Sequence, residues 1–211
     1  MKSYFQLAPL AAIVGLGSLA VVSCKNPADE TTDATVSGEK AVVSQGSGSK
    51  FVFSQDSKIG FVGSKVTGSH SGGFKDFSGH FFVKDGEDKP NAGAFTIQMD
   101  STWSDNEKLT GHLKADDFFG VETYPTATFE MTDAKKMSDN NYQISGNLEL
   151  HGVTKNITFP VTAERSGDTI KFQSEFDINR KDFGINYPGK TDDLIRDEVV
   201  LNLDFVAQKE S

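Results

Sequence analysis

The sequence predicts an all-β fold: an antiparallel barrel of about eight strands with one short helical insert. Three observations predict it. Several segments alternate apolar and polar residues with a period of two, which is typical of strands with one buried face. Gly, Asn, Asp and Ser turn signals separate these segments, so the connections are too short for a parallel sheet. One aromatic segment, residues 112–129, breaks the alternation.

Residues 1–23 predict a secretion signal, and Cys24 directly after it predicts a lipid anchor. Lys2 precedes an almost unbroken apolar stretch, and small residues precede the cysteine. The stretch of roughly 16 residues would reach about 24 Å as a helix, short of the roughly 30 Å core of a bilayer, so we do not expect a retained transmembrane helix. We therefore expect an extracytoplasmic protein, lipid-anchored to a bacterial membrane at the periplasmic face or the cell surface.

Residues 24–50 predict the lipidated cysteine and a flexible linker, because they are polar and rich in Ser, Thr, Gly and acidic residues. Residues 51–211 are then left for one barrel domain with a hydrophobic core. The whole chain carries 21 basic and 30 acidic residues, a net charge of −9. This balance argues against nucleic-acid binding and against docking on anionic lipid head groups. The membrane is expected as a partner through the anchor only.

The strands are expected at eight places along the domain. In the segment NYQISGNLEL, for example, Tyr142, Ile144 and Leu148 share one parity and polar residues take the other. Closing eight strands into a barrel removes exposed edges and leaves an interior that is either filled or holds one small ligand. A β-sandwich stays the alternative on pattern alone. The expected strands are residues 57–66, 74–84, 92–101, 126–132, 141–150, 156–163, 169–178 and 198–207.

The aromatic insert after the third strand predicts a helix that covers one end of the barrel. Ser104 and Glu107 form an S-x-x-E capping box, so the helix is expected to begin there. Pro125 ends the insert, because the residue before a proline disfavours the helical region. Phe118 and Phe119 are large apolar side chains that lie about 100° apart on a helical wheel, and we do not expect both to face solvent. We expect them to form a lid over the open end.

Three ordered motifs resemble the YceI-like family, namely HLKADDFFGVETYPTATF, GNLELHGVTKNITFPV and NRKDFGI. The resemblance covers about residues 53–207. It implies a secreted, extended, lipocalin-like barrel whose apolar tunnel holds a long isoprenoid or fatty-amide-type chain. Many relatives have a histidine late in the first strand, where this chain has Lys65. Lys65 either faces the cavity and meets a ligand head group, or lies past a bulge at Gly63 and extends into water.

The aromatic residues favour a hydrocarbon ligand, because 17 of them are Phe and Phe carries no polar group. The alternative is that these residues only pack a core. Strand parity selects the candidates for the cavity wall, and the insert supplies those for the lid. The candidate ligand-binding residues are Phe61, Lys65, Phe81, Phe95, Ile97, Met99, Phe118, Phe119, Phe129, Met131, Phe159, Phe172 and Phe176.

Signatures of enzymes and metal sites are scarce. Cys24 is the only cysteine, and the sequence has no G-x-S-x-G elbow and no phosphate-binding loop. Arg180 and Asp182 in the NRKDFG motif predict a structural ion pair or a turn clamp rather than a catalytic role. None of the four histidines forms an H-x-H or H-x-x-x-H pair that would suit a metal; they are His70, His80, His112 and His151.

We therefore expect a binding protein with no catalytic residue, no metal and no cofactor. Its partner is expected to be a long-chain apolar small molecule, either an isoprenoid such as a quinone or a fatty-acid derivative. The alternative is a structural or stress-response barrel with a packed interior and no ligand. The oligomeric state stays open, with a homodimer as one option.

Overall fold

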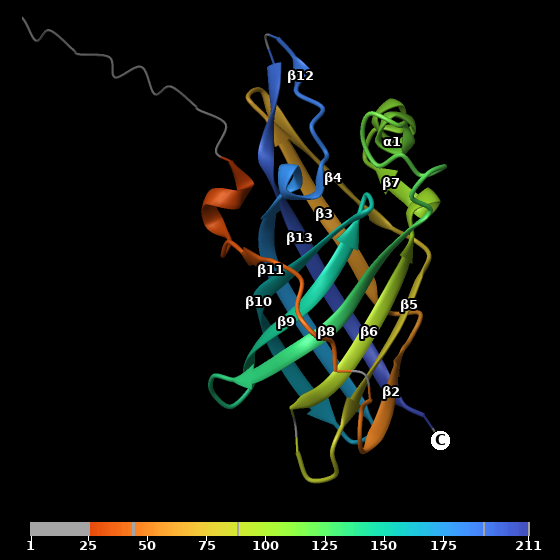
Figure 1. The fold of residues 1–211 in the computed structure, drawn as a ribbon, viewed down its shortest axis with the longest axis vertical. Coiled ribbons are helices and arrows are strands. Elements are labelled where there is room, and N and C mark those ends of the chain that lie inside the picture. The colour runs from red at the N-terminus through yellow and green to blue at the C-terminus, as the bar shows by residue number, and fades with distance from the viewer. Residues whose placement is uncertain (1–25, 44, 88, 192, 211) are drawn as a thin grey trace, which may run out of the picture.

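The computed structural model describes residues 26–43, 45–87, 89–191 and 193–210. The signal sequence and Cys24 lie outside these described residues. Within them, the alternating segments close into an eight-strand antiparallel barrel with one short α-helix (Figure 1). The fold class predicted from the sequence is confirmed, and the β-sandwich is excluded. No helix in the described part of the chain is long and apolar enough to cross a membrane.

Three of the eight barrel strands are each broken into two segments. The first consists of β2 (Ser49–Phe53) and β3 (Lys58–Lys65), which pair one after the other with β13 (Asp193–Lys209). The second consists of β4 (Gly68–Phe74) and β5 (Phe77–Val83). The third consists of β6 (Pro90–Gln98) and β7 (Thr102–Ser104), joined by the 3-10 turn η2 (Met99–Ser101).

The other five strands are continuous and follow in chain order. They are β8 (Thr126–Lys136), β9 (Asn141–Leu150), β10 (Val153–Ser166), β11 (Thr169–Asn179) and β13. The ring closes at β13, which pairs with β11 along one edge and with β2 and β3 along the other. A short 3-10 helix, η3 (Arg180–Phe183), follows β11, and the two-residue strand β12 (Gly189–Lys190) pairs with the start of β13.

The inner faces of the strands form the hydrophobic core. Tyr142, Ile144 and Leu148 on β9 are buried, as their common parity predicts. The same rule holds for Phe159 and Val161 on β10. Because the pleat sends alternate side chains to opposite faces, parity identifies the inward side chains at these positions.

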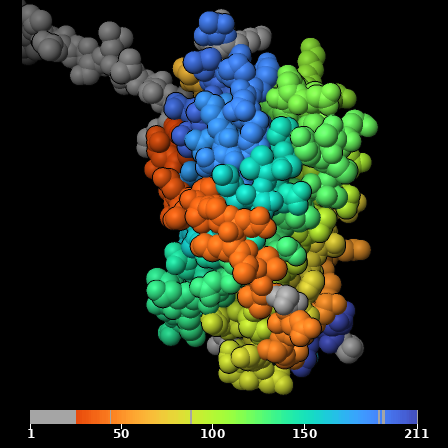
Figure 2. Space-filling model, viewed as in Figure 1, coloured from red at the N-terminus to blue at the C-terminus, as the bar shows by residue number. Residues whose placement is uncertain are grey.

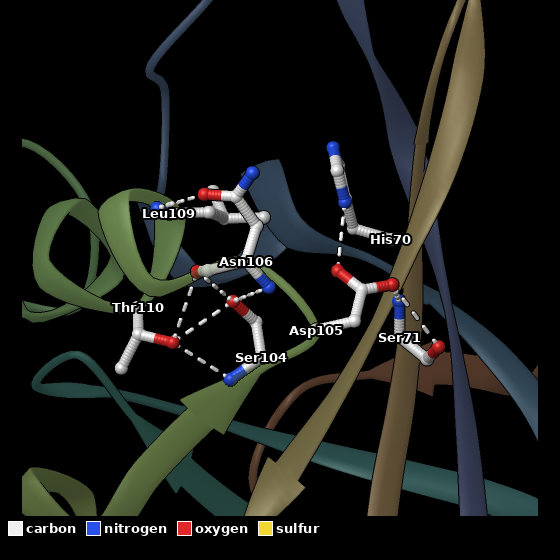
Figure 3. Close-up of polar contacts among 7 residues, drawn as sticks. All are labelled: His70, Ser71, Ser104, Asp105, Asn106, Leu109 and Thr110. Atoms are coloured by element: carbon white, nitrogen blue, oxygen red, sulfur yellow. Dashed lines mark hydrogen bonds and ion pairs between the residues drawn. The ribbon is translucent and has the colours of Figure 1, made fainter.

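The helix α1 (Glu107–Lys114) begins two residues later than a cap at Ser104 would require. Asn106 is the N-cap, and its Oδ1 accepts a hydrogen bond from the Leu109 N–H at 3.1 Å. Ser104 ends β7 and pairs with Gly72, so it is still part of a strand. Its hydroxyl instead donates to the Asn106 carbonyl at 2.8 Å and contacts Thr110 Oγ1 (Figure 3). The predicted capping box is wrong because β7 extends through Ser104.

Residues 26–43 pack on the outside of the barrel, so the expected flexible linker is wrong for this part of it. We call residues 26–43 the strap. It contains η1 (Pro27–Glu30) and β1 (Thr35–Ser37), which pairs antiparallel with β10. Further along, the Asn147 amide donates to the Lys40 carbonyl and accepts from the Lys40 N–H. Figure 2 shows the strap as an orange band across this face.

Candidate functional site

The interior of the barrel contains two cavities with volumes of about 390 and 70 Å³. The larger, which we call the upper cavity, extends from the middle of the barrel to the end covered by α1. The smaller, the lower cavity, lies toward the opposite end, among β5, β6 and β11. Four side chains line both cavities and form the partition between them; they are Phe95, Phe129, Phe159 and Leu203.

All thirteen candidate residues from the sequence line one or both cavities. Seven line the upper cavity alone: Phe61, Lys65, Ile97, Met99, Phe118, Phe119 and Phe176. Three line the lower cavity alone: Phe81, Met131 and Phe172. The remaining three, Phe95, Phe129 and Phe159, belong to the partition. The barrel thus brings together side chains that are more than 100 positions apart in the sequence.

Aromatic rings cross the barrel at the partition. Phe95 and Phe129 stack with ring centroids 5.0 Å apart and an interplanar angle of 12°. Phe129 approaches Phe159 at 5.8 Å, and Phe159 stacks on Phe176 at 4.3 Å. Such pairs add about 0.5–1.5 kcal/mol each to the energy of simple burial. The floor of the upper cavity is therefore a connected set of rings.

The insert between β7 and β8 covers the upper cavity from one side. Leu113 on α1 is buried and lines the cavity, together with Phe118 and Phe119 from the turn that follows. The Phe118 and Phe119 rings meet edge to face at 5.2 Å, and Phe119 packs at 6.1 Å from Phe74 on β4. The insert therefore lies where the sequence placed a lid.

Tyr187, in the segment between η3 and β12, connects this insert to the opposite rim. The centroid of its ring lies 4.5 Å from that of the His112 ring and 6.4 Å from that of the Phe118 ring. His112 Nε2 also lies 3.2 Å from Asp117 Oδ2. Tyr187 is not among the residues predicted from the sequence, because only the folded chain brings this segment against α1.

The mouth of the upper cavity is lined by nitrogen-bearing side chains. Lys65, His70, Asn106, His112 and Arg180 line the cavity at this end, and no Asp or Glu lines it among the described residues. This is notable in a chain with a net charge of −9. No group of three or more His, Asp or Glu that could hold a metal ion occurs in the described ranges. The mouth can therefore offer hydrogen-bond donors to a ligand.

Carboxylates behind this lining hold three of the donors. His70 Nδ1 lies 2.8 Å from Asp105 Oδ1, and the other oxygen of Asp105 accepts from the Ser71 N–H at 3.0 Å (Figure 3). The Ser71 backbone hydrogen bond, followed by that of His70, lowers the pKa of Asp105. His112 faces Asp117 in the same manner, and Arg180 faces Asp197.

Lys65 lies on the inward parity of β3. The pairing of β3 with β4 is continuous, with Gly63 opposite His70 and Lys65 opposite Gly68. The register shift lies in β13 instead, between Ile195 and Val199. The bulge that the sequence allowed at Gly63 is therefore on the neighbouring strand, and Lys65 lines the upper cavity.

Arg180 fixes the turn after β11 against β13. Its side chain is only 3% exposed and donates to the carbonyls of Ile185 and Arg196 at 2.7 and 3.1 Å. The second terminal nitrogen lies 3.2 Å from Asp197 Oδ1. Burial lowers the pKa of Arg180, and the charge of Asp197 opposes this shift. The clamp was expected, but Asp182 is wrong as its partner because β13 places Asp197 there.

The chain is similar to proteins of one family. The YceI-like domain matches residues 52–207. A UPF0312 protein of Pseudomonas putida is 32% identical over 146 residues, which span 65% of this chain and 74% of that protein. A UPF0312 protein of Pseudomonas aeruginosa is 34% identical over 120 residues, spanning 54% of this chain and 62% of that protein.

Solved structures share the fold. BcnA of Burkholderia cenocepacia superposes with a TM-score of 0.67 at 26% identity, over 72% of this chain and 97% of BcnA. A YceI protein of Campylobacter jejuni superposes with a TM-score of 0.57 at 26% identity, over 66% of this chain and 84% of that protein. A polyisoprenoid binding domain from Saccharophagus degradans superposes with a TM-score of 0.63, over 78% of this chain and 100% of that domain. Its identity to this chain is 19%, so this likeness shows the fold alone.

Proposed function

The chain belongs to the YceI-like family, and we propose that it binds the chain of a long apolar molecule, an isoprenoid or a fatty-acid derivative, inside its barrel. The observation that carries the proposal is the upper cavity. Its volume of about 390 Å³ lies within the range of small-molecule sites, roughly 300–1,000 Å³. Its walls below the mouth are Phe, Ile, Leu and Met side chains, which suit a hydrocarbon better than a sugar or nucleotide.

Burial of the hydrocarbon supplies the binding energy. Each CH₂ group removed from water contributes about 0.8 kcal/mol, offset in part by the cost of immobilising the ligand. The polar end of the ligand lies at the mouth, where Lys65 and His70 offer donors to a carbonyl, hydroxyl or carboxylate oxygen. A donor at this position orients the ligand with its apolar end toward the partition.

The protein acts as a carrier rather than an enzyme. Arg180, the buried charge at the mouth, is engaged in hydrogen bonds to two backbone carbonyls that hold the fold. We propose that the protein is exported and anchored through a lipid on Cys24, since the apolar leader ends in small residues before this cysteine. A membrane anchor would keep the carrier beside the source of its ligand.

The test is ligand extraction from two glycine variants. A Cβ at Gly63 would meet no atom within 4 Å and Gly63 lines the upper cavity, so Gly63→Leu adds a side chain at the cavity wall whose Cβ has room. Gly38→Leu is the matched control, because a Cβ there also meets nothing within 4 Å and Gly38 lines neither cavity.

The full chain and both variants are purified from a bacterial host that processes lipoproteins, and their organic extracts and intact masses are compared. We expect one lipid species in near-stoichiometric amount from the wild type and Gly38→Leu, and its loss from Gly63→Leu. Equal recovery from all three would mean co-purified bulk lipid. No species in any extract, and no binding of added isoprenoids or fatty amides, would favour a packed barrel without a ligand.

A further inference from the structure

The strap begins at a defined end of the barrel. Asn26 is 8% exposed, and its Oδ1 accepts hydrogen bonds from Ser64 Oγ at 3.2 Å and from the Ala28 N–H at 3.3 Å. Cys24 precedes Asn26 by two residues, so its Cα can lie no more than about 7 Å from the Asn26 Cα. Ser64 borders the upper cavity, so the strap begins at the mouth end, where Asn26 contacts it.

Two exposed apolar side chains project from the same end. Val66, just after β3, is 57% exposed, and Leu194, at the start of β13, is 51% exposed. The Val66 N–H donates to the Leu194 carbonyl at 3.3 Å, so the two lie side by side. Their neighbours Lys65 and Ile195 line the upper cavity. We call Val66 and Leu194 the lip, because they border the mouth and face outward.

We propose that the lip contacts the surface of the lipid bilayer beside the anchor, so that the upper cavity opens toward the membrane. The proposal rests on the proposed function, since it needs a lipid on Cys24 and an apolar ligand. Two independent features point to the same end of the barrel: the place where the strap begins and the position of the exposed apolar pair. An apolar chain could then pass between bilayer and cavity without crossing water.

The contact is apolar rather than electrostatic. The chain has a net charge of −9, which opposes attraction to anionic head groups. A zwitterionic bilayer, such as one of phosphatidylcholine, is therefore the partner that fits. Because screening by salt acts on charges and not on apolar contacts, the interaction is expected to be insensitive to ionic strength.

Single labels at the lip test the proposal in the full chain. Cys24 is the only cysteine of the sequence, and the proposed lipid would occupy its thiol, so a new cysteine is the only free thiol of a lipidated chain. V66C and L194C place a fluorophore on the lip. M137C is the matched control, because Met137 is also 57% exposed and lies at the β8–β9 turn, near the opposite end (Figure 1).

The labelled proteins are reconstituted in phosphatidylcholine vesicles that contain a lipid carrying a quencher at head-group depth. We expect quenching at V66C and L194C, little at M137C, and no change between low and high salt. Equal quenching at the three positions, or none at the lip, would overturn the proposal. Excimer emission from pyrene on V66C would also overturn it, because it would show that a second copy covers the lip.

Two further measurements separate this proposal from the proposed function. The intact mass of each labelled chain shows whether Cys24 is acylated; an unmodified cysteine removes the anchor and overturns the membrane contact. Ligand extraction from the same preparations tests the cavity by itself. Recovery of a single lipid species without quenching at the lip would leave the carrier function standing and reject its orientation toward the bilayer.

Discussion

The ring of Phe61 on β3 lies across Gly72, its direct partner on β4. A Cβ at position 72 would come within 2.3 Å of Phe61 Cζ and 2.4 Å of the Trp103 carbonyl oxygen. Real Cβ atoms do not approach other heavy atoms this closely. The absence of a side chain at Gly72 therefore makes room for a cavity-wall ring, and the Trp103 backbone closes the other side.

Gly72→Ala should destabilise the barrel by about 1–3 kcal/mol, because neither a strand backbone nor a buried ring can move aside without strain. The measurement is the free energy of unfolding in urea. Gly68→Ala, on the same strand, is the control, since a Cβ there meets nothing within 4 Å. Gly68→Ala should leave the free energy of unfolding unchanged or raise it by a few tenths of a kcal/mol, because alanine lowers the conformational entropy of the unfolded chain. Equal stability of the two variants would contradict this account.

Phe129→Ala should join the two cavities, because Phe129 lines both and stacks on Phe95. The loss of a buried ring costs about 3–5 kcal/mol of stability. The variant should retain longer chains than the wild type does, measured by competition among isoprenoids of increasing length. Phe82→Ala serves as the control, since Phe82 lines neither cavity. An unchanged length preference would mean that the partition does not limit the site.

The double variant Phe118→Ala with Phe119→Ala should release ligand faster. Both rings are half-buried and cover the upper cavity, so their removal opens it to water and costs less stability than a fully buried Phe, below about 3 kcal/mol each. The measurement is the dissociation rate of a fluorescent long-chain probe. If both ligand retention and stability stay unchanged, the insert is not a lid.

Removal of the strap should weaken the barrel. A chain that begins at Lys50 loses the Lys40–Asn147 hydrogen bonds, the bond from the Ala34 N–H to the Asp177 carbonyl, and the pairing of β1. Each lost bond costs about 1 kcal/mol. We expect a lower denaturation midpoint than for a chain that begins at Asn26. Identical midpoints would show that the strap adds nothing to stability.

Asp177 should make stability depend on pH, because it holds the strap from a buried position. Its Oδ2 accepts from Thr31 Oγ1 at 2.8 Å. Burial, aided by the nearby Asp33, raises the pKa of Asp177 although the Thr31 bond lowers it. The native state then binds a proton more tightly than the unfolded state, so stability falls as the pH rises from the ordinary carboxyl range through the raised pKa.

Asp177→Asn removes the charge and keeps an oxygen that can accept from Thr31. The variant should be more stable than the wild type at neutral pH, and the difference should disappear as the pH falls below the ordinary carboxyl pKa of about 3.9. Urea unfolding at a series of pH values measures it. A variant that is less stable at neutral pH would show that the charged form is the one the strap needs.

The sequence by itself determined the antiparallel strands, the inward side chains and the position of the insert, while the resemblance to the YceI-like family favoured a barrel over a β-sandwich. The sequence determined the strands because alternation with a period of two follows from the geometry of the extended chain, which is the same in every strand. Phe95, Phe129 and Phe159 could be assigned to the interior from parity before their mutual contacts were known. The glycine-rich segment Gly68–Phe74 escaped this rule, since glycine carries no side chain whose polarity can alternate.

Tertiary structure alone decided the position of the strap, the helix cap at Asn106, the partner of Arg180 and the polar lining of the mouth. Each depends on which distant segment arrives at a given place. Asn147 meets Lys40 across 107 positions, and Asp197 reaches Arg180 because β13 bulges between Ile195 and Val199. Polar contacts of this kind have no period, so only the closed barrel brings their partners within hydrogen-bonding distance.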